Sequence, residues 1–100
     1  HHLEKAGAVR LFRDRGAVVL SADDAPPQEV EAIWTRLLTL LETLAGQPLV
    51  KAEPAMSPSA RIVEEAGRLD HLGDLANDAM LAGLLKRLAL HRAIIATKAD

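Results

Sequence analysis

The sequence predicts a mainly α-helical protein in which an N-terminal β-hairpin precedes a helical bundle that forms a dimer. Hydrophobic residues make up 49% of the 100 residues, but only one phenylalanine and one tryptophan are present. The core must therefore consist of leucine, isoleucine, valine and alanine. After residue 26 these recur every three or four positions, as in amphipathic helices. A chain of this length rarely buries so much leucine alone, which favours a homodimer.

Residues 3–21 (LEKAGAVRLFRDRGAVVLS) differ from the rest of the chain because they are basic and contain several β-branched side chains. The first of them have helical character up to Gly7, and glycine is the usual residue just past a helix C-terminus. Residues 8–12 and 17–20 alternate as strands do, and residues 14–16 (DRG) between them are a turn signal. We therefore expect the end of a helix followed by a β-hairpin.

The next helix is predicted to begin at Pro26 and Pro27, because proline fits the first helical turn, and Asp23 or Asp24 can cap it. We expect it to end at Gly46, because glycine adopts the left-handed conformation of a helix C-terminus without a steric penalty. Its apolar stripe comprises Val30, Ile33, Trp34, Leu37, Leu38, Leu41, Leu44 and Ala45.

A second helical pattern runs through residues 58–98, with Ser57 as the predicted N-cap and Pro58 in the first turn. Gly73 and the Asn77-Asp78 pair interrupt it, so one long helix and two shorter helices both remain open. The side chains expected to form the core or the dimer contact are Trp34, Leu37, Leu41, Leu44, Leu84 and Leu88.

Charge and cysteine content exclude several classes of protein. The net charge of −2 argues against a protein that coats nucleic acid, although residues 1–20 carry four basic and only two acidic side chains. Because cysteine is absent, disulfides and thiolate metal sites are excluded. No apolar run approaches the roughly 18 residues of a membrane span, so we expect a cytoplasmic protein.

Part of the first segment resembles the end of the recognition helix and the wing of winged helix-turn-helix transcription regulators. The matching residues are Leu3-Glu4-Lys5-Ala6-Gly7, Val9-Arg10, Arg13-Asp14-Arg15-Gly16 and Val18-Val19-Leu20. The resemblance implies double-stranded DNA as a partner, with phosphate or groove contacts from Lys5, Arg10, Arg13 and Arg15. Residues 1–21 would then complete a winged-helix unit whose first helices precede residue 3 in a longer chain. Residues 22–100 would be the dimerisation or effector module. The alternative is an edge hairpin whose arginines keep it soluble.

A weaker resemblance lies in residues 69–78 (LDHLGDLAND), which are similar to the acidic helix of PhoU-type phosphate-uptake regulators. Asp70, Asp74 and Asp78 recur every four positions and would share one helix face. The resemblance implies a divalent-metal site at Asp70 and Asp74. Aspartates at this spacing more often form a solvated helix face, and we therefore predict no metal site.

The sequence shows no motif that would mark an enzyme. It has no recognisable nucleophile–base pair, no phosphate-binding glycine loop and no HExxH ligand pair, so we predict no catalytic residue and no cofactor. The expected function is that of a DNA-binding transcription regulator with a helical dimerisation module. The alternative is a helical interaction or dimerisation domain that does not contact nucleic acid. A small-molecule effector would leave no motif.

Overall fold

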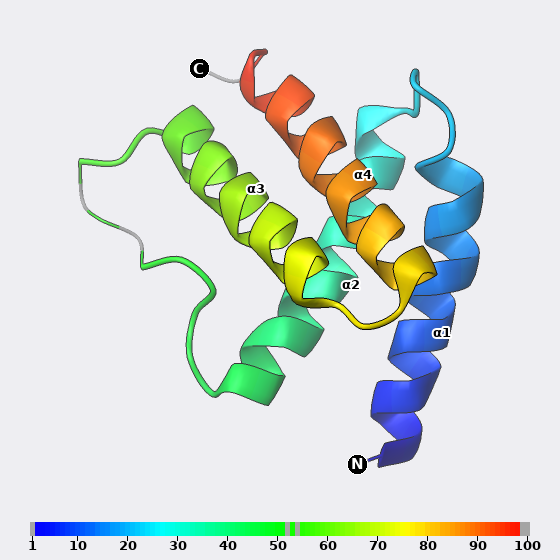
Figure 1. Ribbon diagram of the computed structural model, residues 1–100. Helices are drawn as coiled ribbons and strands as arrows, with labels where there is room; N and C mark the ends of the chain where they lie inside the picture. The colour runs from blue at the N-terminus through cyan, green and yellow to red at the C-terminus, as the bar shows by residue number, and fades with distance from the viewer. Residues whose placement is uncertain (1, 52, 54, 99–100) are drawn as a thin grey trace.

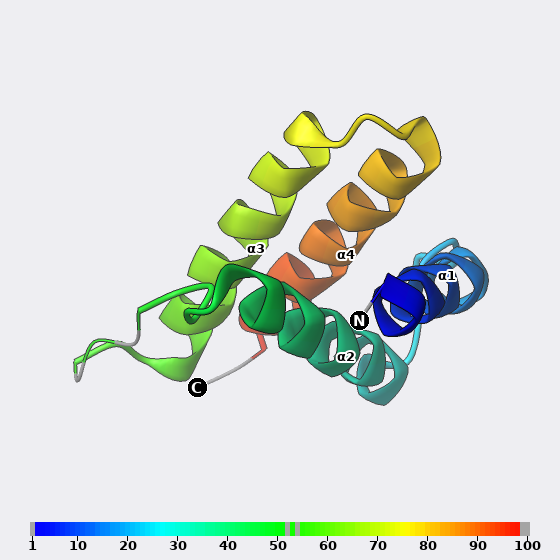
Figure 2. The same ribbon diagram turned by 90° about the horizontal axis from the view of Figure 1, so that it is seen from below.

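The computed structural model describes residues 2–51, 53 and 55–98, which form four α-helices joined by loops (Figure 1). The helices are α1 (His2–Val19), α2 (Pro27–Ala45), α3 (Pro58–Leu75) and α4 (Ala79–Ala96). Helices α3 and α4 lie side by side and antiparallel in one layer, with α2 beneath them and α1 beside α4 (Figure 2). Helix α4 contacts each of the other three.

The prediction of an N-terminal β-hairpin is wrong, because α1 runs without interruption through both predicted strands and the predicted turn. No β-strand occurs within the described ranges. Phe12, Gly16, Val19 and Leu20 are buried and share one face of this helix, whose end packs against α2 and α4. Burial of this face outweighs the weak local preference of valine for strands, which depends strongly on context.

The ends of α2 agree only in part with the sequence prediction. The helix begins at Pro27 and Gly46 ends it with φ 68°, as expected, and the Gly46 amide donates to the Glu42 carbonyl. The N-cap position is Pro26, however, and no side chain caps this end. The predicted cap Asp23 instead pairs with Arg87 of α4.

The pattern over residues 58–98 forms two helices rather than one. Ser57 caps α3 by accepting a hydrogen bond from the Ala60 amide, as predicted. Ala76 then leaves the helical conformation, and the Asp78 carboxylate accepts from the Met80 amide at 2.9 Å to start α4. An aspartate in an N-cap conformation satisfies helix amides that would otherwise lack a partner, which fixes the break at this position.

One hydrophobic core joins all four helices. Its buried members are Phe12, Val19, Leu20, Val30, Ile33, Trp34, Leu37, Ala66, Leu69, Leu84, Leu85, Leu88 and Ala89. Small residues allow α3 and α4 to approach closely. A Cβ added at Gly73 would lie 2.9 Å from Lys86 Cγ and 3.3 Å from the Ala82 carbonyl oxygen. Both distances are shorter than an ordinary van der Waals contact.

Two glycines of α3 are expected to respond differently to alanine. Gly67→Ala should stabilise the chain by about 0.5–1 kcal/mol, because alanine favours a helix and nothing lies within 4 Å of its new Cβ. Gly73→Ala should give no such gain, since its Cβ would collide with Lys86 and the α4 backbone. Urea unfolding measures both effects. Equal stabilisation by the two substitutions would contradict the close approach of α3 and α4.

Candidate functional site

The candidate site is the side of the α3–α4 pair that faces away from α2 (Figure 2). We call it the outer face. Seven residues define it: Val63, Gly67, Asp70 and Asp74 of α3, and Lys86, Leu90 and Ile94 of α4. On each helix they recur every three or four positions, so they form one stripe along each helix.

An ion pair fixes how the two stripes lie against each other. Lys86 Nζ donates to Asp74 Oδ1 at 2.5 Å, which places these residues opposite each other near the α3–α4 turn. Because the helices are antiparallel, one turn further from this pair brings Asp70 level with Leu90. Two further turns bring Val63 level with Thr97, just past the end of α4 and about one turn beyond Ile94.

The outer face is apolar at one end and charged at the other. Val63 and Ile94, which are 57% and 43% exposed, lie at the end far from the turn, and Leu90, which is 50% exposed, lies in the middle of the face. Asp74 and Lys86 occupy the end near the turn, and both are exposed. The stripe was missed in the sequence because α4 carries apolar residues around most of its circumference. A helix of that kind shows no preferred buried side.

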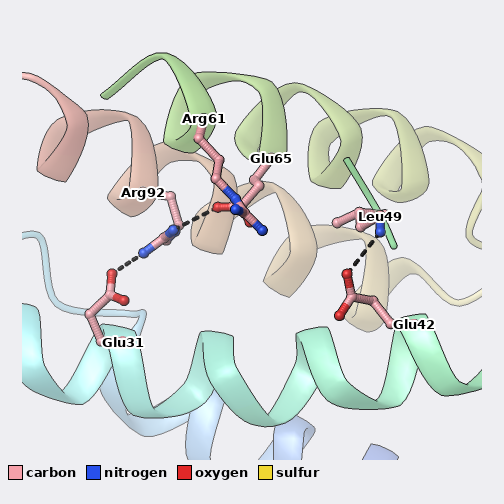
Figure 3. A network of polar contacts seen from close by, with 6 residues as sticks. All are labelled: Glu31, Glu42, Leu49, Arg61, Glu65 and Arg92. Atoms are coloured by element: carbon pink, nitrogen blue, oxygen red, sulfur yellow. Dashed lines mark hydrogen bonds and ion pairs between the residues drawn. The ribbon is translucent and has the colours of Figure 1, made fainter. Parts of the chain in front are cut away.

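Behind the outer face, a buried ion network ties α4 to α2 and α3 (Figure 3). The Arg92 side chain is 4% exposed and donates from Nη2 to Glu65 Oε1 at 2.9 Å. Its Nη1 donates to the Glu31 carboxylate, and its guanidinium carbon lies 5.0 Å from the centre of the Trp34 ring. Arg61 Nε lies 3.7 Å from the other Glu65 oxygen. Arg92 of α4 therefore bridges Glu31 of α2 and Glu65 of α3.

Burial changes the acidity of both members of the inner pair. It raises the pKa of Glu65 above its usual value, Glu42 raises it further, and the nearby Arg61 guanidinium opposes the change. Burial also lowers the pKa of Arg92. The carboxylates and guanidinium groups of the network are directed at one another (Figure 3), and Arg92 Nε is buried without a partner among the described residues. We therefore assign the network to the stability of the helix arrangement.

A second polar cluster fastens the α1–α2 loop to α4. Arg87 Nε donates to the Leu20 carbonyl oxygen at 3.0 Å, and Arg87 Nη2 contacts the Ser21 carbonyl and Asp23 at 3.1 and 2.9 Å. Nε2 of the buried His91 lies 3.2 Å from the same Leu20 carbonyl and donates to it when it carries the proton. No sequence pattern pointed to these contacts, because the partners lie more than sixty positions apart.

The basic residues predicted to contact DNA do not form a joint basic tip. Arg13 pairs with Asp78 at the start of α4, and Arg15 pairs with Glu29 of α2 at 3.4 Å. Arg10 is exposed on α1, and the side chain of Lys5 lies outside the part of the structure that is described. The wing that motivated these four assignments is absent. Duplex binding by this chain stays a prediction.

The aspartates considered for a metal site are divided between two elements. Asp70 and Asp74 are exposed on α3, and Asp78 instead caps α4. Within the described part of the chain, no group of three or more histidine or acidic residues is placed to hold a metal ion. The hydrogen bond from Lys86, together with its charge, holds the pKa of Asp74 below its usual value.

The Asp74–Lys86 pair predicts a defined pH dependence. A lowered pKa in the folded state means that the pair's contribution is present above pH 3.8, the unperturbed value, and is lost as the pH falls through the folded-state pKa. NMR titration should therefore place the Asp74 midpoint below 3.8. Lys86→Gln should raise that midpoint towards the unperturbed value. A midpoint that does not respond to Lys86→Gln would contradict the pairing.

The residues expected in the core or the dimer contact lie mostly inside one protomer. Trp34, Leu37, Leu84 and Leu88 are buried in the core, and Leu41 packs partly buried against it. Leu44, near the end of α2, is half exposed. The fluorescence of Trp34 will therefore report folding of the protomer.

The fold and the site define an all-helical protein with an exposed, partly apolar helix face. No described helix is long and apolar enough to cross a membrane. No family model matches the chain, and neither a curated protein nor a solved structure matches it significantly. The functional argument therefore rests on the geometry of the chain itself.

Proposed function

We propose that this chain is a helical protein-interaction module whose outer face docks another protein chain. The observation that carries the proposal is the exposure of Val63, Leu90 and Ile94 along this face. Single exposed apolar side chains are common on soluble proteins, whereas neighbouring ones mark docking surfaces. Leu90 and Ile94 lie one turn apart on α4, and the register set by the Asp74–Lys86 pair places Val63 at the same end of the face as Ile94.

The packing behind the outer face supports this proposal, because a docking surface binds with less loss of entropy when it is already rigid. The Arg92 network holds α4 against α2 and α3, and Arg87 fixes the α1–α2 loop to α4. The exposed side chains of α4 therefore belong to a helix whose other sides are packed against α1, α2 and α3.

Site-specific photo-crosslinking in living cells tests this function. A photoreactive amino acid at position 90 should yield a defined crosslinked adduct, and the same group at position 68 should not. Arg68 is exposed on α3 but lies outside the outer face. Ile94→Gln should reduce the position-90 adduct, because it removes apolar surface from the exposed end.

The identity of the adduct, established by mass spectrometry, gives the partner. Similar adducts at positions 68 and 90, or no adduct at position 90, would contradict the proposed function.

A further inference from the structure

We propose that the occupant of the outer face is a second copy of this chain, packed about a two-fold axis so that α3 of each copy lies over α4 of the other. This inference rests on the proposed function and names its partner. In such an arrangement every contact occurs twice, and the apolar end of one copy meets the apolar end of the other.

The charges of the outer face favour a second copy over an unrelated protein. Helix α4 contains no acidic residue, and its outer-face stripe carries Lys86. The neighbouring stripe of α3 carries Asp70 and Asp74. Near the turn the surface therefore has acidic side chains beside Lys86, and a two-fold related copy places Asp74 of one chain over Lys86 of the other.

The shape of the face also permits another helix pair to approach. Nothing lies within 4 Å of a Cβ position built at Gly67 or at Gly83, which is exposed one turn before Lys86. Helices can pack closely where residues are small. A second copy would cover the one side of α4 that does not pack against α1, α2 or α3. Such burial is expected for α4, because a helix with apolar residues around most of its circumference is typically buried on all sides.

Sedimentation equilibrium of the purified 100-residue chain tests this proposal. We expect a reversible monomer–dimer equilibrium between about 1 μM and 1 mM, the range of moderate affinities. Leu90→Gln should weaken it by roughly tenfold or more, because this side chain lies at the centre of the contact. The matched substitution Leu44→Gln, at an equally exposed leucine of α2, should leave the equilibrium unchanged.

A charge-exchange experiment provides the specific readout. One variant reverses the acidic side chains (Asp70→Lys with Asp74→Lys), and the other reverses the basic one (Lys86→Glu). Each variant alone should dimerise roughly tenfold or more weakly, since like charges then face each other. An equimolar mixture should recover association, because opposite charges meet again in the heterodimer. Circular dichroism checks that both variants remain helical, and Leu90→Gln keeps the test valid if one of them unfolds.

Two results would overturn the proposal: a monomer throughout the concentration range, or a mixture that associates no better than either variant alone. The crosslinking experiment separates this failure from failure of the proposed function. An adduct at position 90 with a different protein, and a monomer in solution, would exclude the second copy and retain the interaction module. If position 90 yields no adduct and the chain is monomeric, both are wrong.

Discussion

Arg92→Ala is expected to lower the free energy of unfolding by about 3–5 kcal/mol, the cost of removing one partner of a buried ion pair. The substitution leaves the buried Glu65 carboxylate without its 2.9 Å partner and removes the cation that lies over Trp34. It also removes the ion-pair bridge between Glu31 of α2 and Glu65 of α3. A domain of this size has a total of about 5–15 kcal/mol, so urea unfolding should show the loss clearly.

Two further variants separate the ion network from a general effect of losing an arginine. Arg68→Ala, on the exposed side of α3, should change stability by no more than about 0.5 kcal/mol. The double substitution of Arg92→Met and Glu65→Leu should recover most of the loss, because an apolar pair of similar size has no charge to desolvate. A loss below about 1 kcal/mol for Arg92→Ala would mean that the pair behaves as a surface salt bridge.

Leu88→Ala is the second substitution expected to have a large effect. Leu88 is 0% exposed and lies on the side of α4 that packs into the core. Truncating such a leucine removes buried apolar surface and leaves a cavity, which costs about 2–5 kcal/mol. Urea unfolding and the thermal midpoint should both record the loss.

Leu90→Ala is the matched control, on the same helix and with the same chemical change. Leu90 is half exposed on the outer face, so the free energy of unfolding should change by no more than about 0.5 kcal/mol at low protein concentration. Similar losses at both positions would contradict the orientation of α4 that buries Leu88 and exposes Leu90.

The parts of the fold that could be predicted are those whose signals lie close together in the sequence. Pro27 at the start of α2, Gly46 at its end and the Ser57 cap of α3 each act within a few residues. Short apolar segments are ambiguous between strand and helix, and α1 shows the consequence. Valines and the DRG triplet indicated a hairpin, but the partners of Phe12 and Leu20 on distant helices determine the conformation.

The candidate site and the ion network behind it depend on contacts between residues that are far apart in the sequence, which no local sequence pattern indicates. The network of Glu31, Glu65 and Arg92 joins residues that lie 27 and 61 positions apart, and each residue alone is an ordinary helix charge. Conversely, Arg13 and Arg15 appeared free to bind phosphate, but each has an acidic partner on another helix. The outer face cannot be identified from the sequence, because only the packing of α4 against the other helices determines which of its sides is exposed to solvent.

The central position of α4 has a consequence for the order of events during synthesis. Helix α4 contacts all three other helices but follows them in the chain, so the ribosome makes it after them. Until it has emerged from the exit tunnel, the core lacks Leu84, Leu85, Leu88 and Ala89, and only α1 and α2 can form their full contact. The nascent chain should therefore stay sensitive to protease until α4 has left the exit tunnel, and then become resistant in one step. In this protein, translation itself delays the cooperative transition until nearly the whole described segment is available.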